Sequence, residues 1–179
     1  CVDVVEQKII ALEAGEIPIY EPGLDQLVKK NVDAGRLQFS AKLDLHIPSA
    51  DIIFIAVGTP TRRGDGHADL SYVYEAAKNI AECLSGYTVV VNKSTVPVGT
   101  ARQVSRIISE QNPKADYSVA SNPEFLREGA AIRDFMHPDR VVLGVEDSRS
   151  EQLLRDLYRP INLIEAPILV TNWESAELT

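Results

Sequence analysis

The hydrophobic positions of this chain follow two alternating patterns. In the first, apolar residues recur every three or four positions, which is typical of one face of an amphipathic helix. This spacing occurs at residues 24–32, 70–84, 104–108 and 153–158. The second pattern is a short unbroken apolar run rich in β-branched residues, and it occurs at residues 52–57, 88–91, 117–120, 141–145 and 168–170.

Unbroken apolar runs are typical of strands that are covered on both faces, as in a parallel sheet. Strands that alternate with helices indicate βαβ units. We therefore predict an α/β fold with a doubly wound, mostly parallel sheet.

Polar residues predict where several helices begin. Asp69 precedes the second helical stretch and is a candidate cap. Ser148 and Glu151 have the spacing of a capping box, and Thr171 and Glu174 repeat it. We therefore predict helix starts at these three places.

The composition narrows the function classes. The 179 residues carry a formal net charge of −8, which argues against nucleic acid or an anionic membrane as the main partner. An anionic small ligand stays possible because backbone dipoles act locally. Cys1 and Cys83 are too few for a disulfide framework, and no apolar run approaches a membrane span of about 18 residues. With no secretory signal, a reducing cytoplasm is the expected compartment.

Both ends of the chain look cut. Residues 1–3 resemble the tail of a strand with no initiator Met, and residues 172–179 resemble the first turns of an unfinished helix. We therefore expect this chain to be a piece of a larger protein.

Polar residues follow three of the predicted strands at the point where each strand ends. Hydroxyls, amides and charges occur on Pro-stiffened turns at residues 58–61, 92–97 and 121–128. In open α/β sheets, ligands bind beyond the carboxyl ends of the strands. The three segments are therefore the candidate site.

Structural roles remain open for each of these segments. Residues 58–61 could form only a turn and a helix entry, and Ser94 and Thr95 could be capping groups. Glu124 and Glu128 could be solvated surface charges, although a carboxylate near a Thr hydroxyl could also serve as a general base.

Asp3 stands where a dinucleotide-binding fold places the acid that bonds the cofactor ribose. The glycine-rich fingerprint G-x-G-x-x-G, which normally precedes that acid, is absent, so Asp3 could equally be a turn residue or a helix cap. The three histidines have no metal-ligand spacing, so we expect no metal site.

Several longer motifs occur in a fixed order along the chain, and together they carry a specific resemblance. The chain resembles the NAD-binding part of the UDP-glucose/GDP-mannose dehydrogenase family over essentially all of its length. The motifs that carry this resemblance are Cys1–Val4, Pro18–Leu24, Val57–Thr61, Lys93–Gly99, Asn122–Gly129 and Pro138–Val142.

The resemblance implies a Rossmann-like NAD-binding domain over residues 1–170, truncated at its N-terminal strand, its Gly-rich loop and its first helix. Residues 171–179 would begin a helix that connects to absent domains. The family oxidises the C6 alcohol of a nucleotide sugar to a carboxylate with two NAD. A cysteine captures the aldehyde as a thiohemiacetal and then holds a thioester, and that cysteine matches neither Cys1 nor Cys83.

The resemblance also assigns roles to individual residues. Glu124 matches the general base of thioester hydrolysis, and the Thr95 hydroxyl helps to position the reactive water. The residues that match cofactor contacts are Asp3, Lys8, Val57, Thr59, Thr61, Ser94, Thr95, Val96 and Glu128. The residues that match substrate contacts are Glu124, Phe125, Leu126, Arg127 and Glu128.

Within the family, the motifs at residues 123–129 and 138–142 favour a parent enzyme that oxidises UDP-glucose to UDP-glucuronate. The alternatives are oxidation of GDP-mannose or of UDP-N-acetylmannosamine, and, from another class, a catalytically inert scaffold or interaction module. We expect the parent to be a homodimer or higher homo-oligomer. We expect this chain alone to have no catalytic activity.

Overall fold

The computed structural model describes residues 1–62, 64, 66–162 and 166–179. The described residues form two compact units. One unit consists of residues 1–46 and 125–138, and the other consists of residues 47–124 and 139–179. The boundary predicted at residue 170 stays a prediction.

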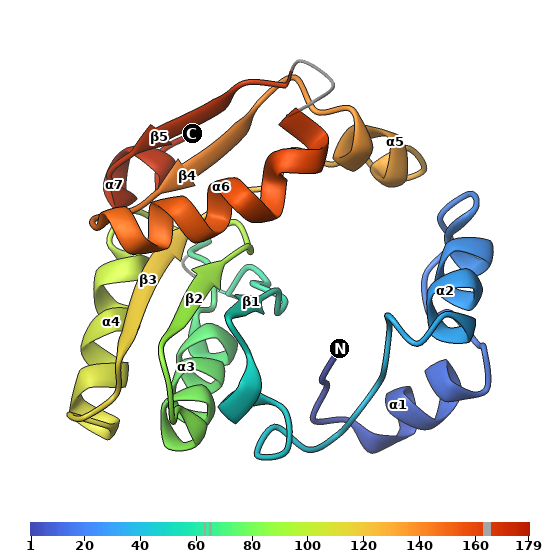
Figure 1. The fold of residues 1–179 in the computed structure, drawn as a ribbon, viewed down its shortest axis with the longest axis horizontal. Helices are drawn as coiled ribbons and strands as arrows, with labels where there is room; N and C mark the ends of the chain where they lie inside the picture. The colour runs from blue at the N-terminus through green and yellow to red at the C-terminus, as the bar shows by residue number, and fades with distance from the viewer. Residues whose placement is uncertain (63, 65, 163–165) are drawn as a thin grey trace. The chain divides into compact units, whose positions relative to one another are not determined.

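The larger unit contains the sheet (Figure 1). Its strands are β1 (Ile52–Ile55), β2 (Thr88–Asn92), β3 (Tyr117–Ser121), β4 (Val141–Gly144) and β5 (Ile168–Thr171). They lie side by side in the order β1-β2-β3-β4-β5. The pairs β1–β2, β2–β3 and β4–β5 are parallel, and β4 runs antiparallel to β3. This sheet confirms the predicted α/β fold with a mostly parallel sheet.

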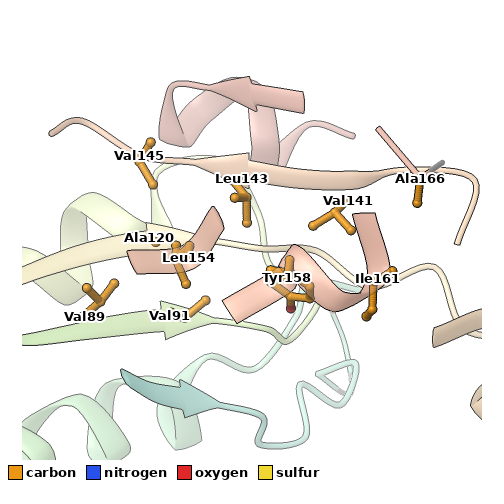
Figure 2. Packing of buried hydrophobic residues seen from close by; sticks show 10 residues of the cluster. All are labelled: Val89, Val91, Ala120, Val141, Leu143, Val145, Leu154, Tyr158, Ile161 and Ala166. Carbon is orange, nitrogen blue, oxygen red and sulfur yellow. The ribbon is translucent and has the colours of Figure 1, made fainter. Parts of the chain in front are cut away.

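One face of the sheet packs against α6 (Ser148–Asn162). Figure 2 shows side chains from β2, β3 and β4 meeting side chains of α6 in a common apolar layer. Alternate residues of a strand point to opposite faces, so Val89 and Val91 enter this layer. The buried members of the layer are Val89, Val91, Ala120, Val141, Leu143, Val145, Leu154, Tyr158, Ile161 and Ala166.

Three further helices, α3 (Ser71–Cys83), α4 (Thr100–Gln111) and α7 (Trp173–Glu177), pack against the sheet or against one another. α7 lies very close to β4, because a Cβ added at Gly144 would come within 2.6 Å of the Ala176 Cβ. The indole N–H of Trp173 donates to the buried carbonyl of Val119 at 2.9 Å. α7 is therefore fixed to the sheet by close packing and by a buried hydrogen bond.

Two of the predicted capping groups are wrong, and the structure shows what replaces them. Ser148 lies inside α6, and the carboxylate of Asp147 accepts the Ser150 amide at 2.8 Å instead. Thr171 ends β5, and Asn172 caps α7 by accepting the Ser175 amide at 2.8 Å. In each case an Asp or Asn one position away satisfies the free amides of the first turn.

The smaller unit contains α1 (Glu6–Glu13), α2 (Leu24–Asp33) and α5 (Ala131–Met136). The predicted strand at residues 1–3 is reduced to an isolated parallel bridge between Val2 and Ser40. The amide of Gly129 donates to the Glu21 carboxylate at 2.9 Å, which ties the segment before α5 to the segment before α2. In the described part of the chain, no helix is long and apolar enough to cross a membrane.

Candidate functional site

The three predicted site segments follow β1, β2 and β3, which are adjacent and parallel. Parallel neighbours end at the same edge of a sheet, so the residues after Ile55, Asn92 and Ser121 share that edge. The sequence-predicted polar segments of the larger unit are therefore brought together.

Side-chain hydrogen bonds join the first two of these segments. The Ser94 hydroxyl donates to the Val57 carbonyl at 2.7 Å, and the Thr59 hydroxyl donates to the Thr95 carbonyl at 3.1 Å. The Lys93 amide also donates to the Ile55 carbonyl at 2.9 Å. These bonds hold the two loops at a fixed spacing.

The other predicted residues of these loops differ in exposure. Thr95 and Thr61 are exposed, whereas Val96 is buried. Thr61 makes an isolated antiparallel bridge with Ala68, which shapes the loop after β1. The Thr95 hydroxyl has no hydrogen-bond partner among the described residues, so it is available to a ligand or a water.

The first residue after β3 in the third segment is Asn122, which is buried and to which sequence reasoning gave no role of its own. The backbone N–H of Asn122 donates to the Asn92 carbonyl at 2.9 Å. The side-chain Nδ2 of Asn122 donates to the Val142 carbonyl at 2.9 Å. Its side-chain Oδ1 accepts a hydrogen bond from the Lys93 ammonium at 3.2 Å. Asn122 thus links the ends of β2, β3 and β4.

Lys93 lies in the predicted segment 92–97, but sequence reasoning gave it no role of its own either. Burial lowers the pKa of its ammonium, and the negative charge of Glu124 opposes that shift. Glu124 itself is exposed and lies in a segment without helical structure. A signal was present in the sequence, because a lysine directly after a fully buried strand is a charge that needs a partner.

Asn92, the last residue of β2, is another buried polar group at this edge. It is 1% exposed, and neither Nδ2 nor Oδ1 has a hydrogen-bond partner within the described residues. A buried amide without partners costs about 1–3 kcal/mol. Such a group fits an edge that receives a polar ligand or an ordered water.

Asp3 and Lys8 lie in the smaller unit. The Asp3 carboxylate accepts the Val5 amide at 2.8 Å and the Lys8 ammonium at 3.1 Å. The hydrogen bond from the Val5 amide lowers the pKa of Asp3 below its usual value. The hydrogen bond and the positive charge of Lys8 lower it further, by less. The carboxylate stays ionised and about a third exposed (35%), which fits an acceptor for the ribose hydroxyls of NAD.

The four predicted residues from Phe125 to Glu128 are exposed and also belong to the smaller unit. The guanidinium of Arg127 forms a two-pronged ion pair with Asp134 at 2.7 and 2.9 Å. This pair holds the pKa of Asp134 at about 2. The segment is thereby fixed to α5 through Arg127. Among the described residues, no group of three or more His, Cys, Asp or Glu side chains could hold a metal ion.

Several known proteins are similar to this chain in sequence and in fold. Residues 1–162 match the family model described as the UDP-glucose/GDP-mannose dehydrogenase family, NAD binding domain. The description names NAD, which confirms the predicted cofactor.

Individual relatives agree with the family match. A UDP-glucose 6-dehydrogenase of Rhizobium meliloti is 58% identical over 99% of this chain, which spans 41% of that protein. A UDP-glucose dehydrogenase structure from Pyrobaculum islandicum has a TM-score of 0.92 at 42% identity over 99% of this chain and 41% of its own. A GDP-mannose dehydrogenase structure from Pseudomonas aeruginosa has a TM-score of 0.92 at 35% identity, with the same coverage. These structures confirm the predicted Rossmann-like fold.

Proposed function

This chain belongs to the UDP-glucose/GDP-mannose dehydrogenase family, and from that premise we propose that it is the NAD-binding part of a UDP-glucose 6-dehydrogenase. The chain spans about 40% of the length of the relatives it matches (41% for the Rhizobium protein), so the activity belongs to a longer protein. The 58% identity to a UDP-glucose 6-dehydrogenase favours UDP-glucose over GDP-mannose, whose dehydrogenase is 35% identical.

The observation that carries the proposal is the convergence of polar groups at one edge of the sheet. Hydrogen bonds fix the loops that carry Thr59 and Thr95 to each other, and the charge of Glu124 acts on Lys93 in the second of these loops. A hydroxyl, a carboxylate and an ammonium thus lie beyond three adjacent strand ends. Acid–base chemistry on a bound alcohol or ester needs groups of this kind.

NAD, when bound, supplies the hydride acceptor for both oxidation steps. We propose that Asp3 and Lys8 hold its adenosine ribose and that the two loops after β1 and β2 line the rest of it. The proposed cofactor contacts in these loops are Val57, Thr59, Thr61, Ser94, Thr95 and Val96. Glu128 is proposed to lie where cofactor and sugar meet.

The nucleotide sugar is proposed to contact the segment from Phe125 through Leu126 and Arg127 to Glu128. A cysteine outside this chain holds the substrate first as a thiohemiacetal and then as a thioester. Thr95 positions a water, and Glu124 takes a proton from it. The water oxygen then bonds to the thioester carbon, the carbon–sulfur bond breaks, and the thiolate leaves. The cytoplasmic location and the homo-oligomeric state of the longer protein stay predictions.

The test is the rate of NADH formation by the full-length protein with UDP-glucose, GDP-mannose and UDP-N-acetylmannosamine in parallel. We expect UDP-glucose to give the highest kcat/KM. Absence of NADH from all three sugars would favour the inert-scaffold alternative, and preference for another sugar would reassign the substrate. In the active enzyme, Glu124→Gln should lower kcat about 100-fold or more, as the loss of a general base does. The matched control is Glu75→Gln, because Glu75 is an exposed residue of α3.

A further inference from the structure

The start of α4 is capped by a side chain from a distant part of the chain. The carboxylate of Glu177, the last residue of α7, accepts the backbone N–H of Gly99 at 2.6 Å and that of Ala101 at 2.6 Å. The first amides of a helix have no partner within the helix, and Gly99 has no side chain that could serve them. Glu177, which lies 78 residues from Gly99 along the chain, therefore takes the place of a local cap.

These amides lie where the loop after β2 ends. At the start of this loop, the Ser94 hydroxyl bonds the segment after β1. At its end is a turn in which the amide and the hydroxyl of Thr100 both donate to the Pro97 carbonyl, at 3.3 and 2.6 Å. Gly99 within this turn has the left-handed conformation, with a φ of 93°. The bond between Gly99 and Glu177 therefore anchors the second end of the loop.

α7 packs against β4 and α4, and contacts that do not involve Glu177 hold it there (Figure 1). The Trp173 indole donates to the Val119 carbonyl at 2.9 Å. The guanidinium of Arg102 in α4 bonds the Glu174 carboxylate and lies 5.0 Å from the centre of the Trp173 ring. α7 therefore presents Glu177 to α4 from a fixed backbone, and a change at Glu177 should loosen the turn without detaching α7.

We propose that Glu177 is a positioning residue for the cofactor, whose carboxylate holds the end of the loop in which Ser94, Thr95 and Val96 are proposed to contact NAD. A loop that is already fixed in its bound conformation loses less conformational freedom on binding, so it binds more tightly. A carboxylate suits this task, because charge-assisted hydrogen bonds are stronger than neutral ones and a negative charge is favourable at a helix N-terminus. The inference rests on the proposed function, which places NAD along this loop.

The test measures NAD affinity by calorimetry in the full-length protein, for wild type and Glu177→Gln. The glutamine keeps one acceptor oxygen but turns an NH2 group toward the second backbone amide. The free loop should then adopt other conformations as well, and the Kd for NAD should rise about threefold to tenfold, because apparent affinity falls with the fraction of protein that is competent to bind. At saturating NAD, kcat and the KM for UDP-glucose should stay within about twofold, since bound NAD selects the same loop conformation.

The matched control is Glu174→Gln, which makes the same change on the same helix. Glu174 also bonds α4, but through the Arg102 side chain rather than through the backbone of the turn, so its Kd for NAD should equal that of wild type. Hydrogen exchange followed by mass spectrometry reads the loop directly. Without NAD, residues 93–103 should exchange faster in Glu177→Gln than in wild type, and the difference should disappear when NAD is saturating.

Thr100→Val loosens the same turn without changing Glu177. It removes the hydroxyl that bonds the Pro97 carbonyl and keeps a side chain of similar volume. Its Kd for NAD should also rise. The double variant Thr100→Val, Glu177→Gln should show less than the combined effect of the two single changes, because both act on one turn. Thr100→Val carries the test if Glu177→Gln does not fold.

The outcomes separate this inference from the function beneath it. If wild type binds no NAD, the proposed function fails and the inference fails with it. If wild type binds NAD and Glu177→Gln binds it equally tightly, only the inference fails. A general structural role would also overturn the inference, and would appear as a lower melting temperature with unchanged NAD affinity, or as equal weakening of NAD and UDP-glucose binding. Equal loss of NAD affinity in Glu174→Gln and Glu177→Gln would overturn it too, because the docking of α7 would then matter rather than the Glu177 carboxylate.

Discussion

Individual side chains at the carboxyl ends of β1 and β2 have structural as well as proposed ligand-binding roles. The hydroxyls of Ser94 and Thr59 each bond a carbonyl of the opposite loop. In the smaller unit, Asp3 bonds the Val5 amide while part of its carboxylate stays exposed. At the residue scale, the proposed ligand-binding residues of each unit, taken by itself, therefore bond the backbone of their own unit.

Asp3 gives the first prediction. Asp3→Asn keeps one oxygen that can accept the Val5 amide. It replaces the second, charged carboxylate oxygen, which would accept the ribose hydroxyls, with an uncharged NH2 group. Hydrogen bonds to charged groups are worth about 1.5–3 kcal/mol, so NAD should bind about tenfold or more weakly. Calorimetry on the full-length protein measures this. Asp44→Asn, at an exposed position of the same unit, is the control. Equal NAD affinity in Asp3→Asn and wild type would remove Asp3 from the cofactor site.

Asp134 gives the second prediction. Its pKa is lowered from 3.8 to about 2 by its hydrogen bonds with Arg127. A lowered carboxyl pKa means that the stabilisation is complete above pH 3.8 and is lost as the pH falls toward 2. The carboxyl carbon of Asp134 should therefore titrate near pH 2 by NMR. Arg127→Gln should move the midpoint back toward 3.8, and a wild-type midpoint near 3.8 would show that the ion pair does not form in solution.

The strands were predictable as elements and the helix caps were not. Unbroken runs such as Thr88–Val91 are too short for helices and rich in β-branched residues, so all five strands follow from the sequence. The expected coverage of both faces is wrong for the edge strands β1 and β5, in which Phe54 and Leu169 are exposed. The caps at Asp147 and Asn172 compete with Ser148 and Thr171 one position away. Spacing alone cannot decide between such neighbours, because the choice depends on where the preceding strand ends.

Gly144 in β4 gives a prediction at the element scale. A Cβ there would meet Ala176 Cβ at 2.6 Å and the Asn172 carbonyl oxygen at 2.9 Å, and the backbone cannot yield as a flexible side chain can. Gly144→Ala should therefore lower the free energy of unfolding by about 1–3 kcal/mol, as overpacking does. Thermal unfolding measures this. Gly86→Ala is the control, because a Cβ at Gly86 meets nothing within 4 Å. An equal effect of the two changes would mean that α7 does not pack on β4 as described.

At the scale of the whole molecule, the sequence predicted where polar groups gather but not how they contact one another. Pro-stiffened turns after three strands indicated the edge that carries Thr59, Thr95 and Glu124. The hydrogen bond from Tyr158 to Asn122 behind that edge could not be predicted, because the two residues lie 36 positions apart and meet only through the packing of α6 on the sheet. Long-range contacts of this kind depend on how helices are placed, which local patterns do not specify.

A crystal structure of the full-length protein with NAD and UDP-glucose tests the central claim most directly. The account predicts that the nicotinamide contacts the Ser94–Val96 loop, that the adenosine ribose contacts Asp3, and that Glu124 lies beside the C6 carbon of the sugar. NAD bound away from the carboxyl ends of β1 and β2, or Glu124 turned away from the sugar, would contradict it.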